Sequence, residues 1–139
     1  MLIDTYVTNS GIHGSGIFTK EAIKANTKIW RFDKGFDIIL LPEQLYIMPV
    51  WQRKFFETYC YMNDGKLYYC VDNARFMNHS ESPNTYEKPD GTYAAINIEM
   101  GDELTSNYAN FGITPEDLVF NYSVFTSAES PKILAKQKI

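Results

Sequence analysis

Apolar and polar residues alternate over short stretches of this chain, and glycine, asparagine or proline ends most of them, which is the pattern of short β-strands. Residues 4–8 and 16–20 are predicted as two strands on either side of a Gly-Ser-Gly turn. Residues 24–27 then turn the chain into a third strand, KIWRF. The chain therefore opens with a small β-meander.

The middle of the chain follows a helical period instead. Pro42 opens a segment with apolar residues at helical spacing: Leu45, Met48, Trp51 and Phe55. Pro49 must interrupt or restart this helix. ETYCYM at 57–62 is then predicted as a strand that enters a hairpin, because Asn63-Asp64-Gly65 is the strongest hairpin turn signal in the chain, and KLYYCVD is the return strand.

Strands are also expected in the second half, at 92–98 and 103–108, joined by a turn through Gly101. Thr114 and Pro115 suit an N-cap and first helical position, so a helix is expected at 115–122, within a C-terminal helix and tail at about 113–139. Many short strands with few short helices predict a mostly β (α+β) fold, as one domain covering residues 1–139.

Composition and charge narrow the class of protein. The 139 residues are 45% hydrophobic, which suffices for the core of one domain. A net charge of −4 argues against a nucleic-acid binder, whose surface would be basic, and is compatible with a basic peptide partner. The sequence lacks a bilayer-length apolar run and a signal-peptide pattern, and its two cysteines, Cys60 and Cys70, form no metal or redox motif. A soluble intracellular protein is expected, with cytoplasm and nucleus equally open.

The clearest chemical signal is the stretch ARFMNHSESPNT at 74–85, which places Asn78, His79 and a Ser-Pro-Asn turn behind an Arg-Phe pair. Each part has an ordinary explanation by itself, because such turns are common and a single histidine is more often structural than functional. The stretch gains weight from two flanking segments, IHGSGIFT at 12–19 and GDELTSNYANF at 101–111.

In this order and spacing, the three segments resemble the SET domain of protein lysine methyltransferases. The resemblance covers nearly the whole chain, with a variable insert at about 33–66. It implies a β-clip fold of several small sheets, in which the Asn-His segment and the chain leading to Tyr108 meet in a knot-like crossing. Many members carry cysteine-rich zinc modules, but this chain is similar to the minimal SET proteins of viruses and bacteria, so no metal is expected.

The resemblance implies S-adenosylmethionine as the cofactor. Backbone groups of the Gly-Ser-Gly turn would cradle it, because the absent side chains let a ligand approach closely. The Asn78 amide would bond its methionine end, and the His79 backbone would meet its adenine. The expected cofactor-binding residues are His13, Gly14, Ser15, Gly16, Tyr59, Arg75, Phe76, Asn78 and His79.

The same resemblance makes Tyr108 the catalytic residue, whose hydroxyl would hold the substrate amine and stabilise the transferring methyl group. A lysine has a pKa of about 10.4 and must lose a proton before it attacks, and an apolar aromatic channel favours its neutral form. The expected substrate pocket consists of Tyr61, Ser106 and Phe111. Tyr59 and Tyr61 are expected on one face of a strand, as a pocket tyrosine or as packing residues.

The predicted function is transfer of a methyl group from S-adenosylmethionine to a lysine of a protein, with histone tails among the candidate substrates. The alternative is a catalytically silent SET-type module that binds a peptide or the cofactor. The expected partner is a lysine-containing protein or peptide, with no direct contact to nucleic acid or membrane. A homodimer, the modified lysine and the number of methyl groups remain open.

Overall fold

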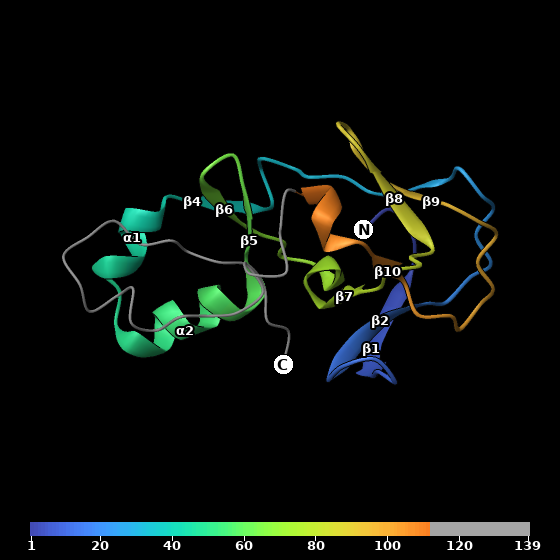
Figure 1. The fold of residues 1–139 in the computed structure, drawn as a ribbon, viewed down its shortest axis with the longest axis horizontal. Coiled ribbons are helices and arrows are strands. Elements are labelled where there is room, and N and C mark those ends of the chain that lie inside the picture. Colours follow the sequence, from blue (N-terminus) through green and yellow to red (C-terminus); the bar gives the residue numbers. More distant parts are fainter. Residues whose placement is uncertain (112–139) are drawn as a thin grey trace.

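The computed structural model describes residues 1–111, so the helix predicted at 115–122 and the tail lie outside the described residues. Within residues 1–111, sheets of two or three strands dominate, joined by two short α-helices and two short 3-10 helices. The mostly β (α+β) fold is confirmed. Figure 1 shows α1, α2 and β4 to β6 on one side of the molecule, β1, β2, β8, β9 and β10 on the other, and β7 between them.

The predicted N-terminal hairpin is confirmed. β1 (Thr5–Asn9) pairs antiparallel with β2 (Ser15–Thr19), with Thr5 opposite Thr19 and Asn9 opposite Ser15. Gly14 in the connecting loop has φ of +49°, a conformation that glycine adopts at little cost. The Gly-Ser-Gly segment therefore both turns the chain and begins β2.

A second sheet has the order β3-β9-β8, formed by β3 (Lys28–Trp30), β9 (Gly91–Ala94) and β8 (Thr85–Lys88). β8 was not anticipated, because the turn signals of the preceding Ser-Pro-Asn obscure its four residues. The strand predicted at 92–98 was too long, since β9 ends at Ala94 and only Ile98 makes a further isolated bridge, to Ile23.

The insert forms a third sheet with the order β4-β6-β5, and two helices precede β5. Its elements are β4 (Ile38–Leu40), α1 (Pro42–Tyr46), α2 (Val50–Tyr59), β5 (Tyr61–Asn63) and β6 (Lys66–Tyr69). Pro49 does interrupt the helix, and the predicted hairpin turn is present, with φ of 50° at Asp64 and 68° at Gly65.

The strand predicted at 57–62 was wrong in its first half. Residues Glu57 to Tyr59 belong to α2, and β5 begins only at Tyr61. Tyr59 and Tyr61 therefore do not share a strand face. The aromatic and β-branched character of ETYCYM favours a strand locally, but α2 continues to Tyr59, and Phe56 on this helix packs against the buried cluster that includes Leu45, Cys60 and Leu67.

Two short segments cross at the centre of the molecule. β7 (Asn78–His79) pairs in parallel with β10 (Thr105–Ser106), and η1 (Asn73–Phe76) and η2 (Tyr108–Phe111) lie next to them in the chain. The strand predicted at 103–108 was too long, because Tyr108 opens η2. The segment that leads into β10 also bonds β2, because the Leu104 amide donates to the Ile17 carbonyl at 2.8 Å.

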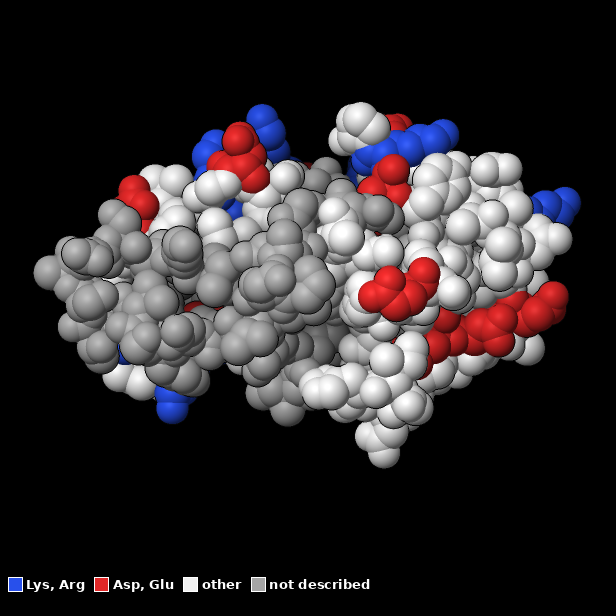
Figure 2. Space-filling view, viewed as in Figure 1, with Lys and Arg blue, Asp and Glu red and all other residues white. Residues whose placement is uncertain are grey.

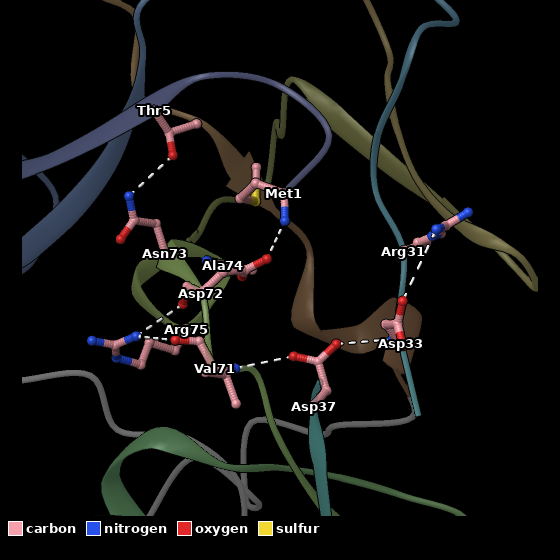
Figure 3. A network of polar contacts seen from close by, with 10 residues as sticks. All are labelled: Met1, Thr5, Arg31, Asp33, Asp37, Val71, Asp72, Asn73, Ala74 and Arg75. Carbon is pink, nitrogen blue, oxygen red and sulfur yellow. Dashed lines mark hydrogen bonds and ion pairs between the residues drawn. The ribbon is translucent and has the colours of Figure 1, made fainter. Parts of the chain in front are cut away.

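The core divides into two clusters. The larger one includes Ile17, Ile29, Ala94, Ile98 and Leu104 and lies under the crossing, and the smaller one belongs to the insert. Figure 3 shows a polar network that links the start of the insert, at Asp33 and Asp37, to the chain around η1. In it the buried Asp37 accepts hydrogen bonds from the amides of Asp33 and Val71 at 2.9 and 3.0 Å.

Gly91 offers a test of the β3-β9 contact. Its φ is +146°, and a Cβ at this position would overlap the Trp30 carbonyl oxygen. Gly91→Ala is therefore expected to lower the free energy of unfolding by roughly 2 to 4 kcal/mol, measured by urea unfolding. The control is Gly11→Ala, because a Cβ at Gly11 would meet no atom within 4 Å. Equal stability of the two variants would contradict this account.

Candidate active site

The loop before β2 is anchored by Ser10 and Glu103. The Ser10 hydroxyl lies 2.8 Å from both carboxylate oxygens of Glu103 and accepts from the amides of Ile12 and His13 at 2.9 and 3.3 Å. The Ser10 amide donates to the Gly14 carbonyl at 2.7 Å. These bonds fix the exposed turn at 11–14 to the segment that leads to Tyr108.

Asn78 fastens the same loop from β7. Its amide nitrogen donates to the carbonyls of His13 and Ser15 at 3.1 and 3.2 Å and to Glu103 Oε1 at 2.8 Å. All three partners are acceptors, so the orientation of the amide group is fixed by chemistry. Asn78 is 2% exposed, and its position joins the two predicted halves of the cofactor site.

Gly16 allows a close approach, but in this structure the approaching group belongs to the protein. A Cβ at Gly16 would overlap Glu103 Oε1. The missing side chain therefore makes room for the carboxylate that holds Ser10 and Asn78. Of the four predicted cofactor residues in this turn, His13 and Gly14 are exposed, Ser15 is half-buried and Gly16 is buried.

Tyr108 is held at both ends by the segment that contains β7. Its hydroxyl donates to the Met77 carbonyl at 2.6 Å, and its backbone amide donates to His79 Nδ1 at 3.1 Å. The tyrosine is 7% exposed, and burial raises its pKa above the ordinary value of 10. The hydroxyl therefore stays protonated near neutrality, and its oxygen can still accept a hydrogen bond.

Three further predicted cofactor residues lie together. The Tyr59 and Phe76 rings meet edge to face with centroids 5.8 Å apart, and the Arg75 guanidinium lies 4.5 Å from the Phe76 centroid. Arg75 also donates to the Val71 and Asp72 carbonyls at 2.7 and 3.0 Å, as Figure 3 shows. In this structure its guanidinium supports the backbone around η1.

Tyr61 lines a cavity of about 610 Å³ between the tips of the β5-β6 and β8-β9 hairpins. Its ring stacks on Tyr68 with centroids 5.3 Å apart, and Phe32 meets Tyr68 edge to face, also at 5.3 Å. The fourth aromatic wall is Trp30. Burial is the main cause that raises the pKa of Tyr61, and the nearby Cys70 and Tyr68 raise it further.

The other two residues of the predicted substrate pocket, Ser106 and Phe111, are not among the described residues that line this cavity. Ser106 is 2% exposed on β10, opposite His79. Phe111 ends η2, and its side chain lies outside the described part of the structure.

Sequence reasoning missed several residues of this region. Ser10, Glu103 and the Met77 carbonyl fix the loop and the tyrosine, and Trp30, Phe32 and Tyr68 line the cavity. Glu103 lies inside the segment GDELTSNY, so its position in the sequence could have marked it as a candidate site residue. A backbone carbonyl gives no sequence signal at all.

Two findings concern membranes and metals. Among residues 1–111, no helix is long and apolar enough to span a bilayer. Over the same residues, no group of three or more histidine, cysteine or acidic side chains is arranged to hold a metal ion. Cys60 and Cys70 are both buried.

Comparison with known proteins identifies the family. Residues 14–109 match the sequence profile of the SET domain, so the chain belongs to the SET domain family. Members of this family are generally S-adenosylmethionine-dependent lysine methyltransferases. No curated protein sequence matches the chain.

Solved structures share the fold. A Plasmodium falciparum protein, provisionally assigned as a histone methyltransferase, is 23% identical with a TM-score of 0.54, over 78% of this chain and 95% of that chain. Two structures of Chaetomium thermophilum Polycomb Repressive Complex 2 also match over 80% of this chain. The one bound to the inhibitor GSK126 gives 15% identity and a TM-score of 0.58, and the apo form gives 16% and 0.61. This chain spans only 15% and 16% of those two chains.

The raised pKa values of Tyr61 and Tyr108 predict instability in alkali. Above pH about 10 these tyrosines stay protonated in the folded protein but lose their protons in the unfolded chain. The free energy of unfolding should then fall as the pH rises, with a slope for each tyrosine that approaches about 1.4 kcal/mol per pH unit once the unfolded chain is fully deprotonated. Urea unfolding between pH 9 and 11 measures this slope. Tyr61→Phe should make it shallower, and Tyr6→Phe, at an exposed position, should not.

Proposed function

We propose that this chain is an S-adenosylmethionine-dependent protein-lysine N-methyltransferase and that Tyr108 is its catalytic residue. The observation that carries the proposal is the doubly held Tyr108, whose hydroxyl donates to the Met77 carbonyl one residue before Asn78. Tyr108 and Asn78, which the sequence predicts as the catalytic and a cofactor-binding residue, are thirty positions apart, and this bond brings their segments together.

The cofactor side of the site is assigned to the turn at 13–16 and to Asn78. Because the Asn78 amide nitrogen is bound within the protein, its carbonyl oxygen is the atom we assign to the cofactor's ammonium group. An amide oxygen and the backbone carbonyls of an exposed turn are acceptors that suit a positively charged ligand. S-adenosylmethionine, when bound, supplies a methyl group on a positively charged sulfur.

Tyr108 would act by position and polarity. Because its O–H proton is already donated to Met77, the oxygen presents its lone pairs to an incoming amine and to a methyl group with partial positive charge. Its raised pKa keeps the phenol protonated near neutrality, so no tyrosinate is available to take a proton from the lysine. The lysine proton must therefore leave by another route, and the protein's contribution is alignment of the reacting groups.

The lysine is assigned to the aromatic wall formed by Trp30, Phe32, Tyr61 and Tyr68 in a cavity whose rim also carries the charged residues Lys34, Glu87, Lys88 and Asp90. Aromatic walls bind the aliphatic stem of a lysine and disfavour its charged form by desolvation. Tyr61, which lines this cavity, also packs against the core cluster that contains Met77. Figure 2 shows acidic side chains gathered along one edge of the viewed face, and these suit a basic peptide.

The first test of the proposal is cofactor binding. S-adenosylmethionine should bind with one molecule per chain, and Asn78→Ala should weaken its affinity by about tenfold or more, because a buried hydrogen-bonding residue is lost. Isothermal titration calorimetry measures both. The matched control is Asn97→Ala, which removes an exposed asparagine that accepts the Ala25 amide far from the loop. Absence of binding by the folded wild-type protein would refute the cofactor assignment.

The second test separates chemistry from folding. Tyr108→Phe removes only the hydroxyl, so methyl transfer should fall by roughly a hundredfold or more while cofactor affinity barely changes. Single-turnover transfer of radiolabelled methyl groups to core histones and to cell lysate gives the rate. Tyr86→Phe is the control, since its hydroxyl bonds Asn26 on the surface. A wild-type rate for Tyr108→Phe would remove this residue from the mechanism.

A further inference from the structure

We propose that the His79 side chain, oriented by Glu81, positions the backbone of Tyr108 and so sets the place of its hydroxyl, an inference that rests on the proposed function. The sequence predicts only a backbone contact for His79. The structure places its ring 5.2 Å from the Tyr108 ring, measured between centroids, with the two planes tilted by 56°. In this role His79 is a positioning residue.

The two nitrogens of the His79 ring make different contacts. Nδ1 lies 3.1 Å from the Tyr108 amide nitrogen, and Nε2 lies 3.0 Å from Glu81 Oε1. A backbone N–H can only donate, so Nδ1 must present a lone pair. An ionised carboxylate can only accept, so Nε2 must carry the proton. Both neighbours therefore select the same tautomer of the ring.

The Tyr108 amide needs such a partner because of its place in the chain. Tyr108 opens η2, and the first amides of a helix have no acceptor within the helix. The chain before Tyr108 is held as far as Ser106. Ser106 pairs with His79, and its carbonyl accepts from the Ser80 amide. The imidazole continues that support by one more residue.

The result is a tyrosine fixed at both ends by one short segment. Met77 holds the hydroxyl through its carbonyl, and His79 holds the backbone through its side chain. Loss of the imidazole contact would free the start of η2 while leaving the β7-β10 pairing intact. The hydroxyl would then lose its fixed relation to the loop that Asn78 anchors.

Glu81 has the smaller part. Its side chain is 88% exposed and that of His79 is 29% exposed, so their interaction is screened by water and salt. Its effect is to favour the tautomer with the proton on Nε2. Removal of its charge should therefore weaken the Tyr108 contact without abolishing it.

The test compares His79→Ala, His79→Asn and Glu81→Gln with the wild-type protein, with Glu21→Gln as the control at an exposed site. Single-turnover methyl transfer uses the protein substrate labelled in the radiolabel screen. His79→Ala should lower the rate by about ten- to a hundredfold at saturating cofactor, with cofactor affinity changed less than threefold. His79→Asn should restore most of that loss, because Asn Oδ1 occupies the place of Nδ1 and accepts the same bond. Glu81→Gln should lower the rate only a few-fold.

Nitrogen-15 NMR of the imidazole supplies a readout that does not depend on activity or on the stability of a variant. In the wild-type protein it should report the tautomer with the proton on Nε2, and hydrogen exchange of the Tyr108 amide should be slow. A proton on Nδ1, a fast-exchanging Tyr108 amide, or an Asn variant no better than the Ala variant would overturn the positioning role. Absence of methyl transfer by the wild-type protein on every substrate would instead refute the proposed function and leave the NMR result to decide the hydrogen bond.

Discussion

The structure depends on one contact, the side-by-side pairing of residues 78–80 with residues 103–106. β7 and β10 share only two residue pairs, but side chains extend the contact on both sides. Asn84 donates to the Glu103 carbonyl at 2.8 Å and accepts from the Thr105 amide at 2.9 Å, as a neighbouring strand would. Because backbone groups buried at a crossing must find partners, these two asparagine bonds let the chain pass through the core.

The same crossing explains why the candidate site is polar yet buried. Its polar side chains Asn78, Thr85, Thr105 and Ser106 are all buried. They hydrogen bond to chain segments distant in sequence, so the loop at 10–16, β7 and the start of η2 form one connected unit. A change at any of these positions should therefore disturb binding and folding together, which is why the most informative variants remove a single atom or exchange one acceptor for another.

The insert contributes differently, because it carries its own apolar cluster. Asp37 bonds Val71 at its base, and the Phe32, Tyr61 and Tyr68 rings form the wall that faces the β8-β9 hairpin. Its cavity can therefore vary in shape while the crossing and the loop stay fixed. This separation suits a site in which one side holds a constant ligand and the other selects a substrate.

The turns could be read from the sequence alone, because they depend on local chemistry: the Gly-Ser-Gly loop, the Asn-Asp-Gly hairpin and the break at Pro49. The Asn-His and Tyr108 segments likewise identified the family of the chain. Tertiary structure decided the rest. α2 includes Tyr59 because helix packing outweighs a local strand preference, and β10 exists only because the distant β7 pairs with it. The Glu103 carboxylate occupies the space beside Gly16. The roles of His79 Nδ1 and the Met77 carbonyl depend on contacts between residues some thirty positions apart. Such contacts leave no local pattern in the sequence, because each partner alone is compatible with many neighbours.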